Sequence, residues 1–363
     1  MAVGWAALSE LVPLYPLYAL LFLEAGVSAD QLSLLFALWS LSGSVTEIPA
    51  GVLADRWSRR RVLALSGVLQ AAAFALWTAV PSVAAFAVGF LVWGVAGACA
   101  SGTAEALVHD ALDEHGAAEC FGRVHGWMTA AELLVQVPTA LLATGLHAAG
   151  GFPLVGWASV GVCLGAAGLA LRLPEAERPT DEESVPAREL LPVLCRPALL
   201  APLVGVAVIG GLDAMEEYFP VLVAGQGVPT GAVPPAVLAI SLAGAAGAAL
   251  GGRLARPGAA LLAALLTAAG LGLLAALALP APVAVPALAL AYGAYLAVLV
   301  SAEAELQRRV AGRYRATVTS VAGLGVEAVS LLVFAAWAGG GPSGLGVLVL
   351  AAVPVVARCL RRS

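Results

Sequence analysis

Twelve long apolar runs separated by short polar loops restrict the fold of this chain more than any other feature. They lie at residues 4–23, 32–53, 62–80, 84–108, 124–146, 151–171, 198–223, 234–252, 257–279, 283–304, 316–337 and 343–358. An α-helix needs about 20 residues to cross a hydrocarbon core about 30 Å thick. The chain is 61% hydrophobic and 11% charged, whereas soluble domains carry about 25% charged residues. The sequence therefore predicts an all-α polytopic membrane protein with twelve transmembrane helices.

The positions of the arginines test this count independently. The chain has no lysine, so all 18 of its Lys and Arg residues are arginine. Every arginine falls between an even-numbered run and the next, or at the end of the last run. Because Lys and Arg concentrate in cytoplasmic loops, both termini are predicted to be cytoplasmic. The lysine-free, Ala- and Gly-rich composition is typical of a high-GC bacterium, so we expect the protein in the cytoplasmic membrane.

A polar stretch at residues 173–197 divides the runs into two sets of six. The two sets match at an offset near 200. The matches are Gly51 with Gly251, Arg56 with Arg256, Ser101 with Ser301 and Glu105 with Glu305. A shared offset of this kind is typical of a duplicated transporter. We therefore predict an N-terminal six-helix bundle at 1–172, a cytoplasmic linker at 173–197 and a C-terminal six-helix bundle at 198–363.

The loop between the second and third runs carries the most specific motif. It reads Gly51-Val-Leu-Ala-Asp55-Arg56-Trp-Ser58-Arg59-Arg60. This segment resembles the G-x-x-x-D-R-x-G-R-R signature of the major facilitator superfamily, with Ser58 in place of the second glycine. The resemblance covers essentially the whole chain. It implies the fold of that superfamily, in which two pseudo-symmetric six-helix bundles form the transporter.

The same resemblance implies a conformational latch at this loop. Asp55 and the arginines would pair with the start of helix 11, near residues 313–317, and stabilise the outward-open state. A carboxylate is favoured near a helix N-terminus, and the contact must break when the halves rock. The alternative is that these arginines only anchor the topology. The expected latch residues are Gly51, Asp55, Arg56, Arg59 and Arg60.

Acidic residues inside the apolar runs are the main functional candidates, because an Asp at the centre of a transmembrane helix costs about 2.5–3.5 kcal/mol. By resemblance, helices 1, 4, 7 and 10 line the central cavity. Helices 3, 6, 9 and 12 face lipid in that architecture, and here they carry no acid. We expect proton or substrate binding in the cavity at Glu10, Glu47, Glu132, Asp213, Glu216, Glu217 and Glu327. Glu105, Glu303 and Glu305 lie near the cytoplasmic ends, and we interpret them as members of interfacial ion pairs.

No arginine lies well inside the runs to pair with these acids. Removal from water favours the neutral form of a carboxyl group. Unpaired acids in such a place therefore hold a proton or receive a cation, and this predicts proton coupling. Five tyrosines on the cavity helices are candidates for stacking on an organic substrate, the alternative being interfacial or packing aromatics. They are Tyr15, Tyr18, Tyr218, Tyr292 and Tyr295.

Motif spacing argues against several other functions. The five cysteines show no CxxC and no metal-ligand spacing, so we expect no metal and no cofactor. The sequence offers no nucleophile–base pair, so we do not expect an enzyme. The one basic run is Arg59-Arg60-Arg61, so we expect no nucleic-acid partner.

These observations favour a monomeric secondary transporter that exports a small organic compound, neutral or cationic, in exchange for protons. Its expected partners are that compound, protons and the lipid bilayer. Two alternatives stay open, namely a proton symporter that imports a neutral metabolite and a non-transporting receptor or assembly protein. Two signatures of proton-coupled drug exporters are absent, the helix 4 arginine and the glycine-flanked proline of helix 5.

Overall fold

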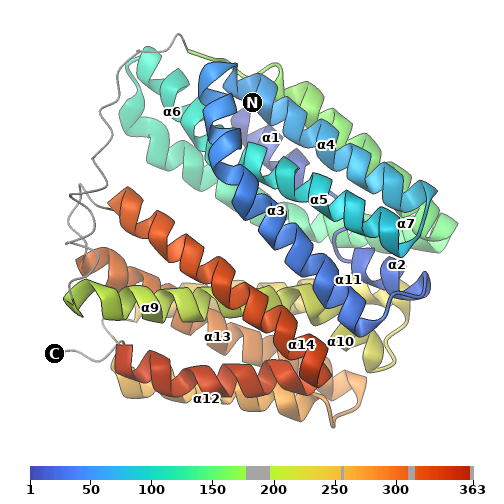
Figure 1. The fold of residues 1–363 in the computed structure, drawn as a ribbon, viewed down its shortest axis with the longest axis vertical. Helices are drawn as coiled ribbons and strands as arrows, with labels where there is room; N and C mark the ends of the chain where they lie inside the picture. The colour runs from blue at the N-terminus through green and yellow to red at the C-terminus, as the bar shows by residue number, and fades with distance from the viewer. Residues whose placement is uncertain (177–196, 255–256, 310–314, 360–363) are drawn as a thin grey trace. The chain divides into compact units, whose positions relative to one another are not determined.

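The computed structural model describes residues 1–176, 197–254, 257–309 and 315–359, and these residues form helices joined by short loops (Figure 1). The N-terminal helices are α1 (Ala2–Glu10), α2 (Tyr18–Glu24), α3 (Ala29–Arg56), α4 (Arg59–Ala79), α5 (Val83–Ala100), α6 (Thr103–Glu114), the 3₁₀ turn η1 (Ala118–Cys120) and α7 (Phe121–Ala170). The C-terminal helices are α9 (Pro197–Gly211), the 3₁₀ segment η2 (Leu212–Tyr218), α10 (Phe219–Gly225), the 3₁₀ turn η3 (Thr230–Ala232), α11 (Val233–Arg253), α12 (Ala259–Ala276), α13 (Ala281–Arg309) and α14 (Arg315–Cys359). The predicted all-α polytopic fold is confirmed.

Eight helical segments in the described ranges are long and apolar enough to cross a membrane. Two of them hold a break that divides them in two, at Gly150 and Gly151 in α7 and at Gly341 in α14. Gly151 and Gly341 have φ of 63° and 55°, which favours glycine because it lacks a Cβ. Each of the twelve predicted runs has helical backbone in its described part. The number of membrane crossings stays a prediction.

Three of the predicted runs contain a break in the helix. Run 4–23 is interrupted between α1 and α2, and run 84–108 changes from α5 to α6 at Ser101 and Gly102. Run 198–223 changes from α-helix to 3₁₀ helix in its middle. Apolar periodicity does not distinguish an intact helix from one that unwinds for a turn, so the sequence alone does not locate these breaks.

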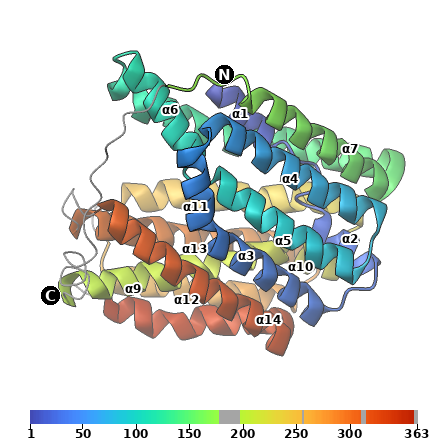
Figure 2. The same cartoon turned by 45° about the horizontal axis from the view of Figure 1, so that its top comes forward.

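The chain forms two compact units. The N-terminal unit holds Met1–Glu182 together with Thr230–Pro235, and the C-terminal unit holds Glu183–Pro229 with Ala236–Ser363. In the N-terminal unit α4 packs against α5 and α7, as Figure 2 shows. In the C-terminal unit α12 packs against α13 and α14. The predicted boundaries at 172 and 198 stay a prediction, and most of the linker lies outside the described residues.

Serine caps begin several of the helices of the N-terminal unit. Ser28 forms a capping box with Gln31, in which the Ser28 Oγ accepts from the Gln31 N–H and the Gln31 Oε1 accepts from the Ser28 N–H at 3.0 Å. Ser58 and Ser82 cap α4 and α5 in the same way, each accepting from the N–H three residues on. These side chains satisfy backbone donors that a helix start leaves unpaired.

Aromatic rings and closely packed glycines contribute to the cores of the two units. In the N-terminal unit, Tyr18 lies among Trp77, Phe90 and Trp93, with ring centroids 5.7–6.1 Å apart, and offset aromatic pairs of this kind add to simple burial. In the described C-terminal unit, glycines set the contact between α11 and α13. A Cβ at Gly244, Gly247 or Gly251 of α11 would overlap α13 atoms, so the two helices approach closely along these residues.

Candidate functional site

The first helix of the N-terminal unit is broken at residues 11–17. Pro13 and Pro16 lack an N–H, so this segment cannot continue the hydrogen-bond ladder of α1. Side chains of α7 satisfy the freed backbone groups. The buried Leu14 N–H donates to the Ser159 Oγ at 3.0 Å, and the Thr139 Oγ1 donates to the Glu10 carbonyl at 3.3 Å. Glu10 is therefore the last residue of α1, beside unwound backbone.

The first helix of the C-terminal unit is broken at the corresponding place. After Gly210 and Gly211 the backbone tightens from α-helix to the seven-residue 3₁₀ segment η2. The Ser330 Oγ of α14 donates to the Gly211 carbonyl at 3.3 Å, as Thr139 does to Glu10 in the other unit. Broken helices in corresponding positions of two repeats are typical of substrate and ion sites in secondary transporters.

The break in the C-terminal unit gathers three acids. Asp213, Glu216 and Glu217 all lie on η2. The Tyr292 hydroxyl of α13 is 3.0 Å from the Asp213 Oδ1 and 3.0 Å from the Glu216 Oε2. Glu217 interacts electrostatically with Glu216. We call Asp213 and Glu216 the η2 acid pair. Tyr292 is the tyrosine that contacts both members of the pair.

Tyr295 lies beside this pair on the next turn of α13. Its hydroxyl donates to the Ile209 carbonyl at 2.7 Å, which satisfies a carbonyl at the end of α9. Glu303, farther along α13, interacts electrostatically with Asp213. The interfacial interpretation fits Glu305, which pairs with Arg308 at 2.7 Å, better than Glu303.

In the N-terminal unit the acids are spread along two helices. Glu10 is half-buried at the end of α1, and Glu132 is half-buried on α7. The two interact electrostatically, and Glu132 interacts in the same way with Glu105 and His125. The N-terminal unit therefore brings Glu10 and Glu132 together, although no single hydroxyl in its described part bridges them.

Glu47 and Glu327 are the remaining acids expected in the cavity. Glu47 is exposed on α3, and the described residues provide it with no hydrogen bond or ion pair. Glu327 is half-buried on α14. A part in a cavity stays a prediction for both of them.

Four of the five tyrosines are covered by protein. Tyr18, Tyr292, Tyr218 and Tyr295 are between 0% and 4% exposed. Tyr218 stacks on Trp337 with ring centroids 4.1 Å apart. These contacts agree with the packing interpretation for the four. Tyr15, the fifth, is half-buried. Its ring stacks on Trp93, and its hydroxyl accepts a hydrogen bond from the Gln70 Nε2 at 2.5 Å.

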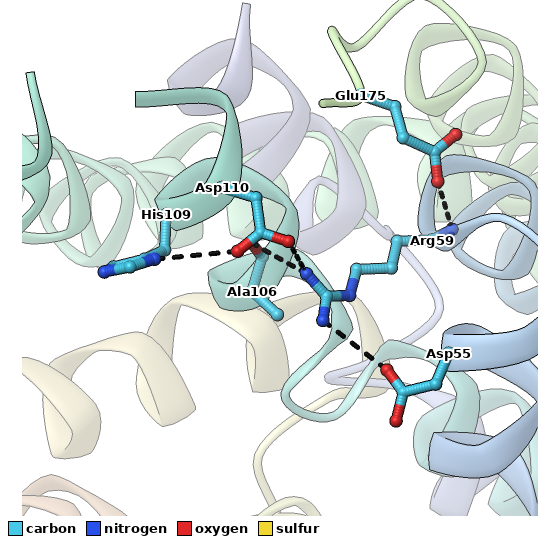
Figure 3. Close-up of polar contacts among 6 residues, drawn as sticks. All are labelled: Asp55, Arg59, Ala106, His109, Asp110 and Glu175. Atoms are coloured by element: carbon cyan, nitrogen blue, oxygen red, sulfur yellow. Dashed lines mark hydrogen bonds and ion pairs between the residues drawn. The ribbon is translucent and has the colours of Figure 1, made fainter. Parts of the chain in front are cut away.

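The signature loop forms a charge cluster inside the N-terminal unit (Figure 3). Arg59 bonds to Asp110 of α6, reaches the Ala106 carbonyl at 3.4 Å, and lies 3.4 Å from the Asp55 Oδ1. Glu175 accepts from the Arg59 backbone N–H at 2.6 Å and from the Ser58 hydroxyl at 2.6 Å. We call Asp55, Arg59, Asp110 and Glu175 the Arg59 cluster.

The other latch residues lie at the edge of this cluster. Arg60 forms an ion pair with Glu175 at 3.3 Å, and Arg56 is exposed. Gly51 has no described atom within 4 Å of the position that a Cβ would take. The expected partner near residues 313–317 lies outside the residues whose side chains the structure describes.

Sequence reasoning missed Asp110 and Glu175, which hold Arg59 in place. Both come from charged stretches that follow apolar runs, and their distance in sequence from Arg59 hides the contact. Ser58 gave a usable signal, because it replaces a glycine of the signature. Its hydroxyl both caps α4 and donates to Glu175. Among the described residues, no group of three or more His, Cys, Asp or Glu is placed to hold a metal.

Comparison with known proteins decides the family. The family model of the Major Facilitator Superfamily matches residues 2–352. The chain belongs to the major facilitator superfamily. It is therefore a multi-pass membrane transporter of a small molecule and not an enzyme. No curated protein sequence matches the chain significantly.

Solved structures of other superfamily transporters share the fold. A bacterial homologue of the human lysosomal transporter Spinster, inward-facing and occupied, has a TM-score of 0.75 at 15% identity, covering 99% of this chain and 93% of that one. The nucleoside transporter NupG has a TM-score of 0.74 at 13% identity, with 99% and 96% covered. The POT family transporter PepTSo has 0.71 at 11% identity, with 99% and 97% covered. At these identities the likeness concerns the fold alone.

Proposed function

We propose that this major facilitator exports a small organic compound, neutral or cationic, in exchange for protons, by alternating access between its two six-helix halves. The observation that supports this most strongly is the η2 acid pair. Two carboxyl groups approach one Tyr292 hydroxyl at 3.0 Å each, at the break in the first helix of the C-terminal unit.

The proton count of this arrangement supports proton coupling. A phenol hydroxyl has one hydrogen to donate, so it satisfies one carboxylate anion at a time. The other carboxyl group bonds to the same oxygen favourably only when it carries the proton of that bond. Two carboxylates that share a site repel each other when both are charged. The pair therefore holds about one proton, or takes up a cation in its place.

The surrounding charges support the same interpretation. In the described C-terminal unit, the arginine side chains of Arg253, Arg308 and Arg358 lie near the ends of their helices. None of them is placed next to η2 to neutralise Asp213 or Glu216. An acid-rich site without fixed positive charge favours a proton, an organic cation or a neutral compound over an anionic substrate.

The Arg59 cluster fits a latch on the cytoplasmic side, with both termini in the cytoplasm. Asp110 and Glu175 hold Arg59 and Arg60, which leaves Arg56 exposed. Asp55 is also exposed, and its contact with Arg59 at 3.4 Å must give way when it pairs with the start of helix 11. On this proposal Arg59 positions the latch and Asp55 makes the contact that breaks during transport.

Import of a neutral metabolite with protons is the second candidate. Tyr15 and Gln70 of the N-terminal unit form a half-exposed pair of neutral hydrogen-bonding groups. Such groups suit an uncharged polar compound, and NupG, which shares the fold, is described as a nucleoside transporter. Direction and substrate charge distinguish the two candidates.

Transport in proteoliposomes with an imposed pH gradient tests both candidates, with ethidium as the cationic probe and uridine as the neutral probe. If the protein exports its substrate in exchange for protons, ethidium moves in the direction opposite to the proton flux. Asp213→Asn or Glu216→Gln then lowers the transport rate about 100-fold, because a positioned proton-transfer group is lost. Glu24→Gln, which changes an exposed acid at the end of α2, is the control variant and should retain most of the rate. Uridine moving with protons would favour import. Gradient-driven transport that survives both substitutions would overturn the proposal.

A further inference from the structure

A line of polar residues follows one face of α7 in the N-terminal unit. His125, Glu132 and Thr139 are spaced by seven residues, which is close to two full turns of an α-helix. They therefore lie on the same face at intervals of about 10.5 Å. We call these three residues the α7 seam. Polar side chains at such regular spacing inside a long apolar helix are costly unless they have a function.

The inner end of the seam meets the break in the first helix. The Thr139 hydroxyl bonds to the Glu10 carbonyl at 3.3 Å. Glu132, one seam step away, interacts electrostatically with Glu10. The seam therefore begins at the unwound backbone beside Glu10.

The outer end of the seam is an imidazole with an unsatisfied nitrogen. The His125 Nδ1 is buried, and no described residue forms a hydrogen bond with it. The ring stacks on Phe121 with centroids 5.6 Å apart and planes 9° apart. Native structures rarely leave a buried polar atom unsatisfied without a functional reason.

Phe121 connects His125 to the Arg59 cluster. The other neighbour of the Phe121 ring is His109 of α6, with centroids 5.3 Å apart. The His109 Nδ1 lies 3.6 Å from Asp110, the partner of Arg59. The seam thus leads from the broken first helix to the charge cluster of the signature loop.

We propose that His125 relays protons between Glu132 and the side of the membrane on which the Arg59 cluster lies. In the inward step the N–H bond of the imidazolium breaks, and the proton passes through water to form an O–H bond on the Glu132 carboxylate. Water is required because the axial step of about 10.5 Å exceeds the length of a hydrogen bond. The return step reverses these bonds. The titratable groups around the relay are Glu10 of α1, Glu105 and His109 of α6, and Glu132 of α7 itself.

This inference rests on the proposed proton coupling, and it separates the roles of the two units. The η2 acid pair holds the transported proton or cation in the C-terminal unit. The α7 seam controls how fast the acids of the N-terminal unit exchange protons. His125 is a relay residue, so its loss slows proton exchange at Glu132 and also removes its electrostatic interaction with that carboxyl group.

The test is a pH jump on the purified full-length protein, followed by time-resolved infrared detection of the Glu132 carboxyl band, which is assigned by its loss in Glu132→Gln. Protons are the only probe, so the measurement does not depend on the substrate. We expect His125→Gln to slow the appearance of this band about 100-fold. His147→Gln, on the same helix but beside Phe152 and away from the seam, is the matched control and should keep the wild-type rate.

A second variant excludes a purely structural effect. His125→Ala with added imidazole should recover most of the lost rate, whereas a misfolded variant would not recover. An unchanged rate in His125→Gln, or a Glu132 band that does not respond to pH, would overturn the relay. A failure of the proposed function would be seen in the transport assay instead. Transport would then survive Asp213→Asn, and this result does not depend on how fast Glu132 is protonated in the pH jump.

Discussion

The first helices of the two units are broken at corresponding places but by different means. In the N-terminal unit, two prolines remove backbone donors, and residues 11–17 leave the helix. In the C-terminal unit, the backbone after Gly211 only tightens to a 3₁₀ helix, and the next proline is Pro220. A 3₁₀ segment keeps its side chains in a regular array, so acids on successive turns of η2 reach one tyrosine. The unwound N-terminal segment gathers no such array, and its acids are spread along α1 and α7.

The helices that carry the matched serines differ in the same way. α5 ends at Ala100, and Gly102 with φ of 67° turns the chain into α6. α13 instead runs unbroken through Ser301, whose hydroxyl reaches the Gly251 carbonyl at 3.3 Å. Residues that match at an offset of 200 in sequence therefore have different surroundings. The two halves therefore share the matched residues and differ in the local structure around them.

The matched glycines give the largest expected difference in stability. A Cβ at Gly251 would overlap the Ala297 backbone, so Gly251→Ala should cost about 3 kcal/mol, near the upper end for overpacking. Gly51 has open space, and Gly51→Ala should stabilise α3 by up to about 1 kcal/mol through its helix propensity. Unfolding in detergent with increasing denaturant measures both variants. Equal effects at the two positions would contradict the close approach of α11 and α13.

The hydroxyl groups at the two breaks give a smaller difference. The Ser159 Oγ donates to the Val155 carbonyl at 2.8 Å and accepts from the Leu14 N–H, so Ser159→Ala leaves a buried donor unpaired and should cost about 2 kcal/mol. The Ser330 hydroxyl donates to carbonyls only, and a carbonyl that loses one bond is better tolerated than an unpaired N–H, so Ser330→Ala should cost about 1 kcal/mol or less. Thermal unfolding of the two variants, with hydrogen exchange at Leu14, checks the order. A larger loss for Ser330→Ala would mean that the C-terminal break is the more strongly constrained.

The sequence alone predicts the all-α fold, the positions of the helices and the family, because apolar length and arginine placement are properties of single segments. It also identifies Glu10, Glu132, Asp213 and Glu216 as acidic residues inside apolar runs. It does not predict which of them meet. Whether Pro13 bends a helix or unwinds it depends on Ser159, which is 145 residues from Leu14. Tyr292 was a candidate for stacking on substrate, but the packing of α13 places its hydroxyl between two acids.

The same limit applies to the signature loop. The motif identifies Asp55 and Arg59, whereas Asp110 and Glu175 are found only once α6 and the end of α7 are folded against α4. Ion pairs between distant segments leave little trace in a single sequence, because charged residues at helix ends are common for topological reasons.

The most direct test of the central claim is a proton count at the η2 acid pair. Infrared difference spectra of the purified protein at neutral pH, wild type against the Asp213→Asn and Glu216→Gln double variant, report carboxylic acid that belongs to the pair. We expect a band equivalent to about one protonated carboxyl group, because the one hydrogen of Tyr292 serves two carboxyl groups and the hydrogen of Tyr295 goes to the Ile209 carbonyl. Tyr292→Phe should shift the frequency of that band, since it removes the hydrogen bond. A wild-type spectrum without this band would show both carboxyl groups ionised and would contradict proton storage at this site.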